Sequence, residues 1–246
     1  MGPYQTVASS RAMNSRQLRR FWKNVCVERA SDGWVICLDH RTAETPAGRP
    51  LCLPSHELAT AIAAEWSAQR REVSPVSMPL TRIANATIDQ VIAKHEQVAD
   101  FLIDYADTDL VCYRALEPVE LVERQARDWD TVLRWASDDF GVEFKLRYGV
   151  IHKPQATKTL KVLGQKVRDL EPFHLTAFYE LVTLTGSLVL GLATIKRWRL
   201  ASKIWQLSRL DEQWQQEQWG VDKEEQAASE NKRHAFLKAY EFYELV

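Results

Sequence analysis

The sequence predicts an α+β protein with a small N-terminal antiparallel β domain followed by a larger multihelical domain. Two observations carry this prediction. Residues 24–53 contain runs in which apolar and polar side chains alternate, which is typical of strands. After Pro54 the apolar side chains recur every three or four residues, as in amphipathic helices, and this pattern continues to the C-terminus. We therefore expect a flexible tail over residues 1–19, the β domain over 20–54 and the helical domain over 55–246.

The N-terminal segment has a biased composition. Residues 1–23 contain four arginines, one lysine, three serines and no acidic residue. This composition is similar to that of a mitochondrial transit peptide, but the segment is short and has no clear amphipathic stripe. The first six residues match the N-myristoylation pattern only loosely. We predict a mostly disordered tail, with a short helix around Leu18 to Trp22.

Two alternating runs predict a β-hairpin. Their apolar residues are Val25, Val27, Trp34, Ile36 and Leu38. Asp32-Gly33 lies between the runs, and this dipeptide is a strong signal for a hairpin turn. A further turn over residues 46–48 leads to a third short strand over Leu51 to Leu53. Three antiparallel strands with one apolar face form the smallest sheet that this pattern supports.

Start and stop signals divide the rest of the chain into helices. Ser55 is a good N-cap for a helix whose apolar face includes Trp66. The clearest helix begins with Pro118 at its first position, keeps strict 3–4 spacing to Phe140 and ends at Gly141. Further helical patterns cover 80–89, about 92–105, the residues after 154, and 172–184.

The composition is that of a globular protein and excludes some classes of function. The 246 residues are 46% hydrophobic and 26% charged, with a net charge of −1, so we expect no nucleic-acid partner. The four cysteines, which show no C-x-x-C pairing, indicate reduced, buried thiols of an intracellular protein. The longest apolar run, Leu181 to Ile195, is too short to span a bilayer. It predicts a buried helix in which Gly186 and Gly191 allow close approach of a neighbour, and we expect no membrane insertion.

The C-terminal stretch from Ser208 to Asp222 has an unusual helical pattern. On a helix of period 3.6, one face carries an ordinary core stripe of Leu200, Ile204, Leu207 and Trp214. The other face carries Trp205, Glu212 and Trp219 at intervals of seven, with Ser208 and Gln216 between them. Gly220 then ends the helix, and Asp222 with Glu225 matches a capping box that opens the next one.

Charge in this region is strongly segregated. Residues 181–210 contain five bases and no acid, whereas residues 211–230 contain seven acids and one lysine. A helix that begins near Arg199 therefore has cations at its N-terminus and anions at its C-terminus, an order that opposes the macrodipole at roughly 0.3–1 kcal/mol per charge. Either a partner surface or a tertiary neighbour selected this arrangement, or both runs are simply solvated faces.

The sequence contains no strong signal for catalysis or for a cofactor. Neither of the two common glycine-rich phosphate-binding patterns is present, and the six histidines are scattered without i+3 or i+4 pairs. Asp107-x-Asp109 offers two carboxylates that could hold Mg²⁺ in a metal-dependent hydrolase. The other interpretation of this pair is a turn at the C-terminus of a helix. We expect no cofactor.

Five separated strings resemble a single family. They are Arg20-Phe-Trp-Lys23, Leu51 to Pro54 followed by Glu65-Trp66, Met78-Pro-Leu-Thr-Arg-Ile-Ala-Asn85, Asp107-Thr-Asp-Leu-Val-Cys-Tyr-Arg114, and Ser208-Arg-Leu-Asp-Glu212 followed by Trp219-Gly220. In this order they resemble the assembly chaperones that bind the free alpha subunit of the ATP synthase catalytic head. The resemblance covers nearly the whole chain, from about Arg20 to past Asp222.

The resemblance implies a non-enzymatic chaperone that binds the alpha subunit, and we expect it to be a monomer. It implies a location in the bacterial cytoplasm, or alternatively in the mitochondrial matrix. Two family positions match by motif. Glu212 corresponds to an acid associated with chaperone function, and Trp66 to a tryptophan that we interpret as structural. The expected partner-binding residues are Glu212, Trp205, Trp219, Arg209 and Gln216. The alternative for Glu212 is a local ion pair with Arg209 or Lys203.

Overall fold

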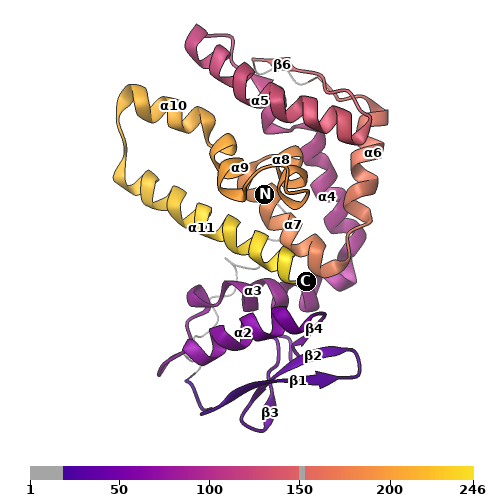
Figure 1. The fold of residues 1–246 in the computed structure, drawn as a ribbon, viewed down its shortest axis with the longest axis vertical. Coiled ribbons are helices and arrows are strands. Elements are labelled where there is room, and N and C mark those ends of the chain that lie inside the picture. Colours follow the sequence, from indigo (N-terminus) through magenta and orange to yellow (C-terminus); the bar gives the residue numbers. More distant parts are fainter. Residues whose placement is uncertain (1–18, 150–152) are drawn as a thin grey trace. The chain divides into compact units, whose positions relative to one another are not determined.

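The computed structural model describes residues 19–149 and 153–246, which divide into two compact units. The first contains residues 19–90 together with Leu245–Val246, and the second contains residues 91–244. An N-terminal antiparallel sheet and a larger set of helices confirm the α+β class (Figure 1). The units divide after Gln90 rather than at the expected residue 54, because the helix over His56–Ala68 packs on the sheet and the helix over Pro79–Ala86 packs on that first helix. The expected tail, apart from Arg19, lies outside the described residues.

The sheet of the first unit is built on the predicted hairpin. Strands β1 (Val25–Ala30) and β2 (Gly33–Leu38) pair antiparallel around the Asp32-Gly33 turn. The short strands β3 (Arg41–Thr42) and β4 (Cys52–Leu53) both pair with β2. One face of the hairpin packs on helix α2 (His56–Ala68), where the Trp34 ring lies 4.5 Å from the His56 ring.

Two capping interactions fix the helices of the first unit. The Ser55 hydroxyl accepts a hydrogen bond from the Leu58 amide and caps α2, as predicted. The Glu65 carboxylate accepts from the amides of Leu80 and Thr81 at 2.8 Å each, at the start of α3 (Pro79–Ala86). A carboxylate at this end of a helix satisfies amides that lack partners within the helix and complements its dipole.

Trp66 belongs to the core of the first unit, as expected for a structural residue. It is 8% exposed, and its ring lies 5.2 Å from that of Trp22, which is 3% exposed. The short helix expected around Leu18 to Trp22 is absent from its described part. Arg19 instead forms a β-bridge with Glu72. The apolar Trp22 is buried because it packs on Trp66.

The second unit is a helical assembly with one short parallel strand pair. Its helices are α4 (His95–Asp107), α5 (Val119–Phe140), α6 (Thr157–Arg168), α7 (Pro172–Thr185), α8 (Leu188–Ile195), α9 (Ala201–Ser208), α10 (Leu210–Trp219) and α11 (Lys223–Leu245). Strands β5 (Tyr113–Arg114) and β6 (Arg147–Tyr148) pair parallel. Short 3-10 turns occupy Ile92–Lys94 and Leu110–Cys112 in this unit, whereas the 3-10 turn Pro75–Ser77 lies in the first unit and the π turn Thr87–Val91 lies at the boundary. As predicted, Gly141 ends α5, in the left-handed conformation.

The apolar run from Leu181 to Ile195 forms two helices and not one. Gly186 has a φ of +70° and ends α7, and Ser187 caps α8. The expectation for Gly191 is confirmed, because a Cβ there would lie 2.8 Å from a Val182 methyl carbon on α7. No helix within the described ranges is both long and apolar enough to cross a membrane.

The expectation of four buried thiols is wrong for two of the cysteines. Cys37 and Cys112 are buried, but Cys26 is exposed and Cys52 is partly exposed. Cys26 and Cys37 lie directly opposite each other in the β1–β2 register, on the face of the hairpin that does not pack on α2. The apolar neighbours of Cys26 in the sequence therefore point to the other side of the strand.

Candidate functional site

The predicted C-terminal helix is interrupted at Arg209. Its backbone has a φ of −112° and a ψ of 19°, and it separates α9 from α10. Because the helix is interrupted here, the spacing of seven does not continue unbroken from Trp205 to Trp219. Trp205 and Trp219 are consequently in different environments. Trp205 is 4% exposed, whereas Trp219 is 75% exposed.

Trp205 is a core residue, which corrects the expectation that it lies on the non-core face. Its ring packs 5.5 Å from the ring of Phe236 on α11, and Phe236 is fully buried. The expected core stripe needs a matching correction, because Leu200 at the start of α9 is 74% exposed. Ile204 and Leu207 are buried as expected. The bend and the packing of α11 on α9 decide these environments, and neither has a local signal in the sequence.

Arg209 connects the buried and polar sides of this region. Its guanidinium lies 5.1 Å from the centre of the Trp205 ring, a cation–π distance. It also forms an ion pair of 2.9 Å with Glu212, three residues later. The side chain of Arg209 is 17% exposed and that of Glu212 is 41% exposed. The local ion pair considered for Glu212 is therefore present, with Arg209 as the partner.

Four of the five expected binding residues line one hollow. Its volume is about 210 Å³, and it lies between the α9–α10 segment and α11. The lining residues are Trp205, Gln206, Arg209, Glu212, Gln213, Gln216, Ser229, Glu230 and Arg233. Trp219 is not among them. The hollow thus has an aromatic floor, a polar rim and charges of both signs.

The wall contributed by α11 was not foreseen from the sequence. Ser229, Glu230 and Arg233 lie on this helix, and Arg233 forms an ion pair of 2.7 Å with Glu230. An i, i+3 pair of opposite charge is common on exposed helices, so it does not single out a site by itself. Only the return of α11 beside α9, which buries Phe236 against Trp205, brings these residues to the hollow.

The opposite side of α10 is fixed to α5. Gln125 donates to the Asp211 carboxylate at 2.8 Å, and Arg124 forms an ion pair of 2.6 Å with Glu217. Hydrogen bonding to Arg124 lowers the pKa of the Glu217 carboxyl. Nearby, the Trp129 indole donates to the Leu207 carbonyl at 2.8 Å. These contacts hold one face of α10 on α5, so that Glu212 and Gln216 are left facing the hollow.

The end of α10 presents exposed apolar side chains. Trp219 is 75% exposed and Val221 is 54% exposed, and Trp214 lies edge-on to Trp219 at 5.8 Å. Gly220, with a φ of +92°, ends the helix, and the Asp222 carboxylate accepts from the Glu224 amide at 2.7 Å to cap α11. Figure 1 shows α10 and α11 joined by this turn at the edge of their unit.

We refer to residues 210–233, which comprise α10 and the first part of α11, as the acidic arm. Residues 221–228 are all exposed, so the turn before α11 and the start of α11 make little contact with the rest of their unit. Seven acidic residues and one lysine lie between positions 211 and 230. The acidic arm therefore combines a negative surface with an exposed tryptophan at its tip.

The aspartate pair considered for a metal site is used for structure. The Asp107 carboxylate accepts from Arg147 at 3.2 Å and from the Gln155 amide at 2.7 Å. Asp109 is fully buried and accepts from the Ser187 hydroxyl at 2.5 Å and from the Val189 amide at 2.9 Å, at the start of α8. Neither aspartate belongs to a group of three potential metal ligands among the residues described.

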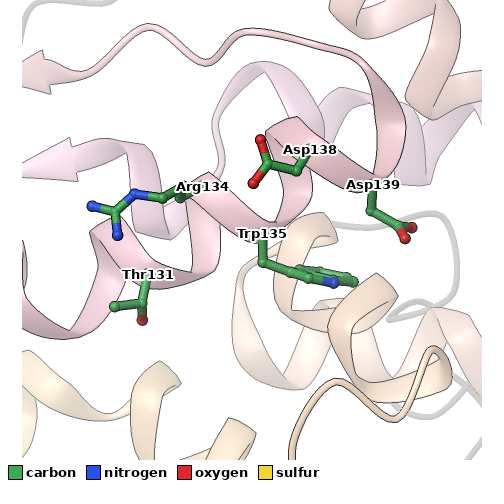
Figure 2. A pocket seen from close by; sticks show the side chains of 5 residues that line it. All are labelled: Thr131, Arg134, Trp135, Asp138 and Asp139. Atoms are coloured by element: carbon green, nitrogen blue, oxygen red, sulfur yellow. The ribbon is translucent and has the colours of Figure 1, made fainter.

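A second hollow of about 500 Å³ lies along α5. Its lining residues are Thr131, Arg134, Trp135, Asp138 and Asp139 (Figure 2). Figure 2 shows these side chains spread along the helix, with the carboxylates of Asp138 and Asp139 pointing in different directions. The Trp135 ring stacks on the Trp198 ring, with 5.4 Å between the ring centres. No group of side chains converges here as an acid–base or nucleophilic site requires.

With this geometry established, comparison with known proteins identifies the family. Residues 19–137 match the family described as ATP12 chaperone protein. The crystal structure of Atp12 from Paracoccus denitrificans is 42% identical to this chain and superposes with a TM-score of 0.89. That match covers 92% of this chain and 97% of the Paracoccus chain. The chain belongs to the ATP12 chaperone family.

Two further relatives are similar over most of their length. The Atu1473 protein from Agrobacterium tumefaciens is 35% identical, with a TM-score of 0.89 over 92% of this chain and 85% of that chain. The mitochondrial protein atp12 of Schizosaccharomyces pombe is 27% identical over 231 residues, which is 88% of this chain and 78% of the yeast protein. Membership of the ATP12 chaperone family confirms the resemblance to the ATP synthase assembly chaperones and the α+β fold that it implied.

Proposed function

We propose that this chain is an assembly chaperone without enzymatic activity, and that it binds the unassembled alpha subunit of the ATP synthase catalytic head. The observation that carries the proposal is the acidic arm with the hollow at its base. The exposed Trp219 and the partly exposed Glu212 both lie in this arm, and polar side chains line the hollow. Such a combination serves binding and not turnover, and the relatives' description as chaperones supports this interpretation.

The proposed client has an apolar surface that must be covered before assembly. An alpha subunit without its beta neighbour exposes the apolar surface that this neighbour covers in the assembled head, and exposed apolar surface promotes aggregation. A chaperone must cover this surface reversibly. A few aromatic anchors surrounded by a polar rim provide enough affinity for this, while a large apolar interface would hinder release.

Each predicted residue has a proposed role. Trp219, at the tip of the acidic arm, is the apolar anchor, because three-quarters of its side chain is exposed. Glu212 and Gln216 face the hollow. The Glu212 carboxylate accepts hydrogen bonds from the client, and the Gln216 amide can accept or donate them. Arg209 orients the Glu212 carboxylate through the 2.9 Å ion pair. Trp205 forms the buried floor that holds Arg209 in place.

The charge of the acidic arm adds orientation. Seven acids between positions 211 and 230 favour a client surface with basic residues around its apolar patch. Charged rims of this kind mainly set the association rate and the orientation of the partners. Binding should therefore weaken as the salt concentration rises, because screening acts on exposed charges.

Co-expression tests the proposed function. The alpha subunit is produced alone and together with this chain, and the soluble fraction and its co-purification are measured. We expect the alpha subunit to remain soluble and to co-purify only when the chaperone is present. A client that stays insoluble, or that is captured equally by an unrelated acidic protein, contradicts the proposal. The expected place of action is the bacterial cytoplasm or the mitochondrial matrix, and in support one relative is named as mitochondrial and another comes from a bacterium.

A further inference from the structure

The β1–β2 hairpin gathers three potential metal ligands on one face. Cys26 and Cys37 are directly opposite each other in the antiparallel register. Glu28 is two residues beyond Cys26 on the same strand, so its side chain projects from the same face. One ligand atom from each residue, two sulfurs and one carboxylate oxygen, lies within 4.8 Å of the other two.

This face of the sheet is accessible to a solvent ion. Helix α2 packs on the other face, where Trp34 meets His56. Cys26 and Glu28 are exposed, while Cys37 on the central strand is 6% exposed. The three side chains therefore form a shallow site with one buried and two exposed ligands, which leaves room for water at a fourth position.

The three groups crowd one another electrostatically. The Cys26 thiol lies 3.8 Å from a Glu28 carboxylate oxygen, a weak hydrogen bond in which sulfur donates. Burial, followed by the nearby Glu28 and Cys26, raises the pKa of the Cys37 thiol to about 11. This repulsion arises only when a thiol loses its proton, as it must to bind a metal ion. A cation that replaces the thiol protons removes this repulsion.

The ligand set indicates the class of cation. Two thiolates select thiophilic ions, and a carboxylate completes a set that suits Zn²⁺ better than Mg²⁺ or Ca²⁺, which prefer oxygen alone. Zn–S bonds of about 2.3 Å in a tetrahedron place two sulfurs roughly 3.8 Å apart. The ligand atoms, all within 4.8 Å of one another, need only small side-chain rotations to reach this geometry.

We propose that Cys26, Glu28 and Cys37 bind one Zn²⁺ ion on the outer face of the sheet, with water at the fourth position. The ion joins β1 to β2 at the opposed pair Cys26 and Cys37, and it stabilises the first unit. Binding releases the thiol protons and involves no change of oxidation state. The site is independent of the acidic arm, so it stands or fails separately from the proposed function.

Zinc binding to the full-length chain tests the site directly. The protein is purified in a non-thiol reductant, stripped of metal and titrated with Zn²⁺ against a chromophoric chelator. We expect one equivalent to bind and the melting temperature to rise, because a ligand that binds only the folded state stabilises it. Co²⁺ in place of Zn²⁺ should give the thiolate charge-transfer absorption and the visible bands of a tetrahedral site.

Variants separate this site from adventitious binding. Cys26→Ser and Glu28→Gln alter exposed residues, so they should fold and should weaken Zn²⁺ binding by about tenfold or more. Cys37→Ser should do the same, with circular dichroism to check its fold. Cys52→Ser is the matched control, because Cys52 lies on the same sheet but outside the cluster, and its affinity should match the wild type.

Two results overturn the proposal. In the first, Zn²⁺ binds equally to the wild type and to Cys26→Ser, or Co²⁺ shows no thiolate absorption. In the second, the wild type binds no Zn²⁺, but oxidised glutathione links Cys26 to Cys37 by thiol–disulfide exchange. Opposed residues in an antiparallel pair are close enough for a disulfide bond. Mass spectrometry after this treatment would detect the Cys26–Cys37 disulfide and would assign the pair to redox chemistry.

Discussion

The guanidinium of Arg209 lies against the ring of Trp205 and, at 2.9 Å, forms an ion pair with the carboxylate of Glu212. One side chain thereby joins a buried aromatic floor to a partly exposed acid. This arrangement gives Glu212 a fixed orientation at the hollow without burying its charge. The ion pair with Arg209 occupies one of the two carboxylate oxygens of Glu212, and the other accepts no hydrogen bond from the described residues. Glu212 is therefore placed to meet a donor from a partner.

Glu212→Lys should strongly weaken client binding while the protein stays folded. The variant loses a partly exposed ion pair and places a lysine beside Arg209, which should change the free energy of unfolding by about 1 kcal/mol or less. A like charge set against the client's donor should weaken binding strongly. Thermal melting and a pull-down of the alpha subunit measure the two effects.

Glu241→Lys provides the matched control for this variant. Glu241 forms an i, i+3 ion pair of 2.7 Å with Lys238 on α11, and its side chain is 44% exposed, close to the value for Glu212. The same charge reversal outside the hollow should leave the pull-down unchanged. Equal loss of binding in both variants would attribute the effect to net charge, and unfolding of Glu212→Lys would make Glu212 structural.

The two tryptophans of the predicted site should respond in opposite ways to truncation. Trp205→Ala removes a side chain that is 4% exposed and should lower the free energy of unfolding by about 3–5 kcal/mol. Trp219→Ala removes one that is 75% exposed and should cost less than about 1 kcal/mol, yet it should weaken client binding. Urea denaturation and pull-down distinguish the cases. Normal binding by Trp219→Ala would remove the tip of the acidic arm from the interface.

Two substitutions of different severity should show that Trp66 stabilises the fold. Trp66→Ala should cost about 3–5 kcal/mol, because the side chain is 8% exposed and packs on Trp22. Trp66→Phe should cost much less, because the indole nitrogen is buried without a hydrogen-bond partner among the described residues. Melting temperatures test this order. A Trp66→Ala variant that melts like the wild type but fails to bind would place Trp66 at the interface instead.

Local patterns in the sequence were sufficient for most elements. Alternation around Asp32-Gly33 predicted the hairpin, and the 3–4 spacing from Pro118 to Gly141 predicted α5, because these signals act over a few residues. The same reasoning failed at Arg209. Neither glycine nor proline marks the bend, and tertiary contacts of Trp205 with Phe236 and of Trp129 with Leu207 favour it.

The candidate site was predicted in part for the same reason. Residues on one helical segment, Arg209, Glu212 and Gln216, could be grouped by spacing alone, and the structure groups them at one hollow. Arg233 could not be added, because its position depends on how α11 returns along α9. The membership of α2 and α3 in the first unit likewise depends on packing, which periodicity does not encode.

Asp109 should make stability depend on pH in a direction opposite to most carboxylates. Burial raises its pKa to about 6, against an ordinary value of 3.8, although the Ser187 hydroxyl and the Val189 and Val111 amides oppose this shift. Between these two values the folded protein binds more protons at this site than the unfolded chain. The stabilising contribution of this carboxyl is therefore complete below about pH 4 and is lost as the pH rises through about 6.

Asp109→Asn isolates this contribution, because an amide does not titrate. The change also replaces one acceptor at the start of α8 with a donor, which should cost about 1–3 kcal/mol at any pH. The quantity to measure is the free energy of unfolding of the wild type minus that of the variant, by urea denaturation between pH 4 and 7. This difference should fall as the pH rises, by about 1.4 kcal/mol per pH unit within the window and by roughly 3 kcal/mol in total. A difference that instead grows with pH would mean that the hydrogen bonds from Ser187 and the two amides outweigh burial, so that Asp109 is held as a stabilised anion at the N-terminus of α8.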